Sequence, residues 1–333
     1  MKGRLRSSNF YCRSIFRSMS TINLNQLSVL PIDNWRRDAI ISGIKEVGSE
    51  ISSSISDASG LIWIDPRDAK ELENILNNNS NIQWVQLPFA GVEPYIELMK
   101  SKNHITWSCG KGTYAKPVAE MALALALSGF RGLSTYIRQG AKSFGRPVGM
   151  NLFNARVTIL GGGGITQELI PMLIPFSCKI TVIRKSSVKK MNGVDRVLQL
   201  DQLHEVLPNT DLLVLALALT QETRNVIGQQ ELSLLPTHAW VINVARGQHI
   251  DTQALVHALE SNSIGGVGLD VTEPEPLPVD HPLYSMNNVI ISPHVGNTPE
   301  MGIPLLVQRV KDNAVRWRSK ETLIGLVNTD AGY

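Results

Sequence analysis

The sequence predicts an α/β protein of two domains, each built on a doubly wound parallel sheet, with a cleft between the domains. Three observations favour this fold class. The chain has 333 residues, more than one ordinary hydrophobic core organises. Its composition, 43% hydrophobic and 18% charged, is that of a folded globular protein. Short apolar runs alternate with helical patterns along most of the chain, as in βαβ units.

The N-terminal half shows this alternation from about Leu27. We expect strands at residues 28–30, 61–64, 82–87 and 104–107, and helices at residues 35–47, 69–76 and 94–100. An Ala/Leu-rich stretch at 118–127 follows Pro117, which can open a helix. Because this helix is apolar nearly all round, we expect it to be buried between other elements.

The C-terminal half begins with a β-branched strand at 157–160 that leads into four glycines and a helix at 165–173. Further strands are expected at 179–183, 212–219, 240–244, 266–269 and 289–291, and further helices at 230–235 and 252–260. These make a sheet of about six strands. A helix over 299–320 lies outside it and should return to the first domain. The expected substrate domain is therefore 25–115 plus 299–333, and the dinucleotide-binding domain is 116–298.

The first 32 residues contain five basic side chains and no Asp or Glu. This composition is typical of a mitochondrial transit peptide, which is rich in Arg and Ser and poor in acids. A disordered extension, or translation from Met19, explains it equally well. We expect residues 1–24 to be a leader or extension, and the protein to be mitochondrial or cytoplasmic.

Charge, apolar runs and cysteines exclude several classes of partner. The net charge of +3 owes much to the N-terminal segment, so nucleic-acid binding is not expected. The longest apolar runs, 118–127 and 212–219, are too short to cross roughly 30 Å of hydrocarbon, so no membrane partner is expected. Cys12, Cys109 and Cys178 form no CxxC pair, and no metal site is expected.

The pattern Gly161-x-Gly163-x-x-Thr166 stands between a predicted strand and a predicted helix. Gly161 permits the tight turn, and Gly163 lets the backbone approach a pyrophosphate at the helix N-terminus. Thr166 replaces the glycine that lets helix and strand pack closely. The order of elements predicts dinucleotide binding, although a structural Gly-rich turn is the simpler alternative.

The next strand ends in Arg184-Lys185-Ser186-Ser187, where an NAD site usually carries Asp or Glu to hold the ribose hydroxyls. Two cations and two hydroxyls could surround a 2′-phosphate instead. NADP(H) is therefore favoured and NAD(H) remains possible. An ordinary solvated basic strand end is the alternative.

Three polar side chains each follow a predicted strand of this sheet: Arg246, Glu275 and His294. Taken singly, each is more often a surface or structural residue. Ligand sites in open α/β sheets lie at the carboxyl ends of strands, so the three could converge. Imidazole titrates near neutral pH, a partner such as Glu275 favours imidazolium, and Arg246 can hold a carboxylate.

Five stretches, at 157–165, 211–223, 242–251, 268–278 and 291–298, together resemble the D-isomer-specific 2-hydroxyacid dehydrogenase family, which includes glyoxylate and hydroxypyruvate reductases. Weaker similarity at 87–92 and 112–120 extends the likeness into the first domain. The resemblance implies two Rossmann-like domains and hydride transfer between NADP(H) or NAD(H) and a small 2-keto or D-2-hydroxy acid. It also implies a homodimer, with the apolar helix near the interface.

The resemblance assigns catalysis to Arg246, Glu275 and His294, and substrate binding to Ala90 and Gly91 with Arg246 and His294. The expected cofactor-binding residues are Gly161, Gly163, Gly164, Ile165, Arg184, Lys185, Ser186, Ala218, Thr223, Val244, Ala245, Arg246 and Asp270.

The sequence departs from the family pattern at Ala218, where proline is usual, at Thr166, and at residues 108–111. These positions affect cofactor fit and cleft shape rather than the reaction class. A binding protein that senses dinucleotides, similar to the transcriptional corepressors that share this fold, is the alternative function.

Overall fold

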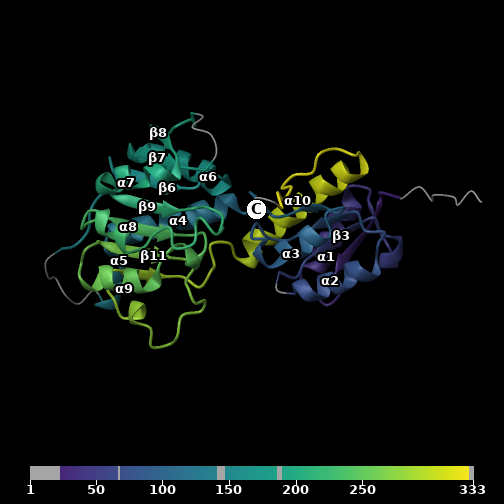
Figure 1. Cartoon of the computed structure of the whole chain (residues 1–333), viewed down its shortest axis with the longest axis horizontal. Coiled ribbons are helices and arrows are strands. Elements are labelled where there is room, and N and C mark those ends of the chain that lie inside the picture. Colours follow the sequence, from purple (N-terminus) through teal and green to yellow (C-terminus); the bar gives the residue numbers. More distant parts are fainter. Residues whose placement is uncertain (1–22, 67, 141–146, 186–189, 330–333) are drawn as a thin grey trace, which may run out of the picture.

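The structure is a computed structural model that describes residues 23–66, 68–140, 147–185 and 190–329. It contains two parallel sheets in two lobes (Figure 1). The first sheet has the strand order β2-β1-β3-β4-β5. Its strands are β1 (Gln26–Leu30), β2 (Glu50–Ile51), β3 (Gly60–Trp63), β4 (Trp84–Gln86) and β5 (Thr106–Ser108). Each expected strand of this half is present, and the two-residue β2 was not expected.

The second sheet has seven strands in the order β12-β11-β10-β9-β6-β7-β8. Its strands are β6 (Arg156–Leu160), β7 (Lys179–Ile183), β8 (Arg196–Leu198), β9 (Leu212–Leu215), β10 (Trp240–Asn243), β11 (Gly266–Leu269) and β12 (Val289–Ile291). All its ladders are parallel. The chain order reverses at β6 and β9, which is the switch point where ligands bind in such sheets.

Ten α-helices connect and cover the strands in the described part of the chain. They are α1 (Arg37–Glu46), α2 (Ala69–Asn78), α3 (Ile96–Ser101), α4 (Ala115–Phe130), α5 (Leu133–Arg138), α6 (Gly164–Leu173), α7 (Leu203–Val206), α8 (Gln229–Leu234), α9 (Thr252–Glu260) and α10 (Pro299–Arg318). None of the described helices is long and apolar enough to cross a bilayer.

Helix α4 is buried against other elements along one face, as expected, and its opposite face is exposed. It packs against α6, β10 and β11. Ala122, Leu125 and Ala126 are buried in this packing, whereas Glu120 and Ala124 are exposed. The Ala/Leu-rich composition predicted the helix but could not show how much of its circumference other elements cover.

Helix α10 packs against α1, on the lobe of the first sheet (Figure 1). Lys311 of α10 forms an ion pair with Glu46 of α1 at 2.8 Å. The Asn313 side chain is fully buried and donates to Gln86 Oε1 of β4 at 2.7 Å. These contacts fix the C-terminal helix to α1 and β4, which lie more than two hundred residues earlier in the sequence.

Candidate active site

Arg246, Glu275 and His294 follow three neighbouring strands of the second sheet. Arg246 comes after β10, Glu275 after β11 and His294 after β12, and these strands are paired in parallel. The loops that carry the three side chains therefore all leave the sheet at the carboxyl ends of its strands.

His294 and Glu275 form a close pair across two of these loops. His294 Nδ1 lies 2.7 Å from Glu275 Oε1, and both side chains are about half exposed. Because a carboxylate only accepts, Nδ1 carries the proton and donates it to Glu275. The other ring nitrogen, Nε2, remains to exchange a proton with a ligand.

The buried Asp270 fixes the loop that carries His294. One carboxylate oxygen accepts from Ser292 Oγ at 2.7 Å and from the Val295 N–H at 2.9 Å. The other oxygen accepts from the Gly296 N–H at 2.9 Å. The Asp270 carbonyl also accepts from the His294 N–H at 2.8 Å. Asp270 therefore holds the backbone on both sides of His294.

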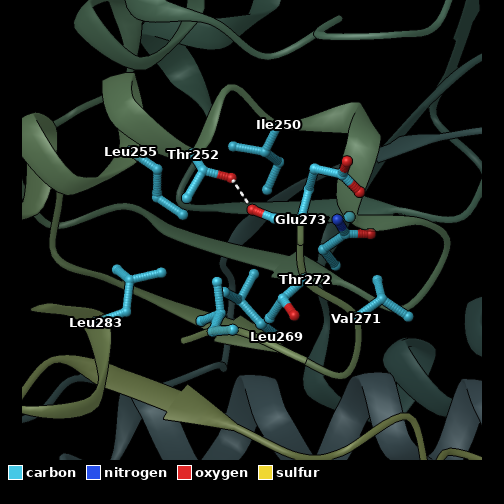
Figure 2. A pocket seen from close by; sticks show the side chains of 11 residues that line it. Ile250, Thr252, Leu255, Leu269, Val271, Thr272, Glu273 and Leu283 are labelled. Atoms are coloured by element: carbon cyan, nitrogen blue, oxygen red, sulfur yellow. Dashed lines mark hydrogen bonds between the residues drawn. The ribbon is translucent and has the colours of Figure 1, made fainter. Parts of the chain in front are cut away.

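The start of helix α9 forms a hydrogen bond with the loop that carries Glu275. Figure 2 shows a small pocket in which Thr252 Oγ1 donates to the Glu273 carbonyl at 2.8 Å. Its walls are largely apolar, including Leu255, Leu269 and Leu283, and neither Arg246 nor His294 lines it. The pocket is therefore a packing gap beneath the loop rather than a substrate site.

Arg246 connects the loops of the two sheets. Its Nε donates to Glu93 Oε1 at 3.1 Å, and its Nη1 donates to the Ala245 carbonyl at 2.7 Å. A Cβ on Gly91 would lie 1.8 Å from Arg246 Nη2, so only glycine allows the guanidinium so close to this loop. Val244 and Ala245, two of the expected cofactor residues, are buried just before Arg246.

Glu93 was not foreseen from the sequence. Its only signal was a carboxylate two residues after Gly91, in a stretch that reads equally well as the start of a helix. Nothing in the sequence pairs it with an arginine 153 positions later. The contact exists because the loop after β4 faces the loop after β10.

Ala90 and Gly91, the expected substrate-binding loop, follow β4. Ala90 is exposed, so its backbone is accessible, and the neighbouring Phe89 carbonyl accepts from the Gly110 N–H at 3.0 Å. Cys109 Sγ lies 4.0 Å from the Ala90 carbonyl, and burial raises the pKa of this thiol. The loop is thus braced by the segment after β5.

The glycine loop has the geometry that a dinucleotide requires. Gly161 has φ of +106°, and a Cβ there would lie 2.2 Å from the Ala216 carbonyl oxygen. Gly163 precedes α6, and a Cβ at this position would meet no atom within 4 Å. Gly164 and Ile165 form the first turn of α6, whose N–H groups point toward an approaching anion.

Thr166, the departure from the glycine pattern, is fully buried in α6. Its hydroxyl donates to the Gly161 carbonyl at 2.7 Å. The side chain that replaces the third glycine therefore ties the start of α6 to the glycine loop by a hydrogen bond.

The basic stretch after β7 lies beside the glycine loop. A Cβ on Gly162 would be 3.2 Å from Arg184 Cδ, which places this arginine over the loop. Lys185 Nζ forms an ion pair with Glu222 Oε2 at 2.7 Å. Glu222 therefore brings a carboxylate that the sequence did not suggest. Ser186 lies outside the described residues.

A buried histidine links two loops of the cofactor side. His249 Nδ1 lies 2.9 Å from the Thr223 carbonyl, and Nε2 lies 3.3 Å from the Leu217 carbonyl. Thr223 Oγ1 in turn donates to the Ala218 carbonyl at 2.8 Å. Burial lowers the pKa of His249, and the two carbonyl contacts oppose this effect. The sequence did not single out His249, because a histidine in a loop has no spacing signal.

Two parallel α/β sheets, a dinucleotide-type glycine loop and a histidine–carboxylate pair at strand ends define a class of dinucleotide-dependent oxidoreductases. Residues 121–296 match the model of the D-isomer specific 2-hydroxyacid dehydrogenase NAD binding domain. The chain is 34% identical over 280 residues to an uncharacterized protein from the proB 3′ region of Corynebacterium melassecola, covering 80% of this chain and 91% of that one. The chain therefore belongs to the D-isomer specific 2-hydroxyacid dehydrogenase family.

Two further comparisons agree with this assignment. The glyoxylate reductase of Korarchaeum cryptofilum is 29% identical over 311 residues, covering 90% of each chain. A D-isomer specific 2-hydroxyacid dehydrogenase from Xanthobacter autotrophicus Py2, solved in complex with NADPH and MES, has a TM-score of 0.79 at 23% identity. That comparison covers 92% of this chain and 99% of the other, and it shows the shared fold.

Proposed function

We propose that this enzyme reduces a small 2-keto acid, such as glyoxylate or hydroxypyruvate, to the 2-hydroxy acid with NADP(H), with D configuration where the product is chiral. The observation that carries this proposal is the pair of His294 and Glu275 at 2.7 Å, on the sheet edge that also carries Arg246. The name of the Korarchaeum cryptofilum relative, glyoxylate reductase, supports the substrate class.

Arg246 would hold the substrate carboxylate. Its guanidinium is permanently charged, and it lies against Gly91, whose loop presents an accessible backbone. Backbone N–H groups at Ala90 and Gly91 would complete the carboxylate site. Two-sided contact of this kind fixes the orientation of the carbonyl group relative to His294.

His294 would give a proton to the substrate carbonyl oxygen through Nε2. Glu275 holds Nδ1 and thereby sets the direction of the ring, and its charge stabilises the imidazolium before the transfer. Asp270 keeps the surrounding loop in place. Bound NADPH supplies the hydride.

The glycine loop and the start of α6 would hold the pyrophosphate of the cofactor. Arg184 would contact the 2′-phosphate of NADP(H), assisted by Lys185. Solved structures with this fold include complexes with NADPH and with NAD+, so they agree with either cofactor. NAD(H) remains the alternative, since the carboxylate of Glu222 lies beside Lys185.

The domain division and assembly are part of the proposal. We propose that residues 25–115 with 299–333 form the substrate domain, and that residues 116–298 bind the dinucleotide. The contacts of α10 with α1 support this division. The enzyme would be a homodimer with α4 near the interface, which light scattering on the purified protein would test.

The direct experiment is an absorbance assay with purified protein, NADPH or NADH, and a panel of 2-keto acids. We expect NADPH oxidation with at least one small acid of the panel. A protein that binds NADPH but oxidises it with no acid would reject the enzyme and would favour the dinucleotide-sensing alternative.

A further inference from the structure

We propose that Glu93 is a specificity-determining residue that restricts the site to 2-keto acids with a single anionic group. Dicarboxylic and phosphorylated 2-keto acids would be poor substrates. The inference rests on the proposed function, because it assumes that Arg246 receives the substrate carboxylate.

Glu93 lies along one edge of the guanidinium that would receive this carboxylate. Glu93 Oε1 accepts from Arg246 Nε at 3.1 Å. The same hypothetical Cβ on Gly91 that lies 1.8 Å from Arg246 Nη2 also lies 2.7 Å from Glu93 Oε2. Nη2 and Oε2 are therefore at most 4.5 Å apart, the sum of these two distances. The carboxylate of Glu93 thus extends along the Nε–Nη2 edge, beside the loop that would bind the substrate.

Solvent and ligands can reach this pair. The side chains of Glu93 and Arg246 are each 33% exposed, so neither is sealed in a core. A ligand carboxylate bound to Arg246 would have Glu93 as an immediate anionic neighbour. One negative group is tolerated, because it would accept hydrogen bonds directly from Arg246. A second negative group on the same ligand would be repelled by Glu93.

Charges of both signs surround the substrate loop. Asp270 accepts from backbone N–H groups and adds negative potential, whereas protonated His294 offsets the charge of Glu275. Cations also lie near the substrate loop: the Arg36 guanidinium is 5.7 Å from the centroid of the Phe89 ring, and Arg309 donates to the Cys109 carbonyl at 2.9 Å. If Arg36 bound a second anionic group, wild-type enzyme would prefer doubly charged acids, and the proposal would be wrong.

The expected effect is a change of selectivity. Two like charges about 8 Å apart in a partly exposed site repel each other enough to change an affinity about tenfold, after screening by salt. Glu93→Gln should therefore raise kcat/KM for doubly charged acids, relative to singly charged acids of the same size, about tenfold. Glu93→Asp, which keeps the charge, should retain most of the discrimination.

The test compares 2-oxoglutarate with 5-methyl-2-oxohexanoate, which has the same shape without the second charge. Glu97→Gln is the matched control, because Glu97 is four positions along the chain, 87% exposed and paired with Lys100. The ratio of the two kcat/KM values should change in Glu93→Gln and stay constant in Glu97→Gln. An unchanged ratio in Glu93→Gln would overturn the proposal.

A binding measurement separates this proposal from the proposed function. N-oxalylglycine and N-isobutyloxamate are non-reducible acids of similar shape with two charges and one charge. Their affinities for the enzyme–NADPH complex can be measured from quenching of NADPH fluorescence. If wild-type enzyme reduces no 2-keto acid, the proposed function fails, and this affinity ratio in Glu93→Gln still decides the role of Glu93.

Discussion

Asp270→Asn should destabilise the loop of His294 with little change of side-chain shape. The two carboxylate oxygens accept from different backbone N–H groups, those of Val295 and Gly296. Asparagine offers one acceptor oxygen, so one of these N–H groups must face an NH₂ group. An unsatisfied buried donor costs about 1–3 kcal/mol, and hydrogen bonds to a charged acceptor are the stronger kind. We therefore expect a loss of about 3 kcal/mol in the free energy of unfolding.

The assay is equilibrium unfolding in urea at neutral pH, together with turnover of the best 2-keto acid. Asp251→Asn is the matched control, since one oxygen of Asp251 accepts from both Gln253 N and Ala254 N at the start of α9. Asparagine caps helices as well as aspartate does, so the control should lose almost nothing. Equal stability of Asp270→Asn and Asp251→Asn would refute the role given to Asp270.

Two further predictions concern acid stability and cofactor choice. Burial raises the pKa of Asp211, but hydrogen bonds from Arg156 and His238 outweigh it and bring the pKa to about 2, below the ordinary 3.8. This lowered pKa stabilises the fold above about pH 4 and the benefit is lost as pH falls toward 2. Asp211→Asn should thus cost about 2 kcal/mol at neutral pH, and a cost that stayed constant down to low pH would contradict this. Arg184→Ala should weaken NADPH binding about tenfold and NADH binding much less; equal losses in titrations of the two cofactors would reject the phosphate contact.

Most of the fold could be predicted from local patterns. Strands β6, β9 and β10 are covered on both faces of the sheet. Such strands are nearly continuous hydrophobic runs, which are easily recognised in a sequence. Strand β8 was missed because it has only three residues, begins with Arg196 and is partly exposed. Its position at the sheet edge removes the burial that makes other strands readable.

Site residues could be predicted only where they directly follow strands of the parallel sheet, because ligand sites lie at the carboxyl ends of these strands. His294 and Glu275 were expected together because both follow strands of one sheet, and the structure pairs them. Glu93 and His249 could not be found in this way. Each acts through a contact between loops distant in sequence, and neither loop has a periodic pattern that encodes its partner.

The central claim is that His294, held by Glu275, supplies the proton during reduction of a 2-keto acid. The most direct measurement compares NADPH oxidation by wild-type enzyme and His294→Ala with the best acid of the panel, at equal occupancy of NADPH. Loss of a positioned general acid lowers turnover about 10²–10⁴-fold. The account predicts a loss of this size with NADPH affinity unchanged. Full turnover by His294→Ala would contradict it.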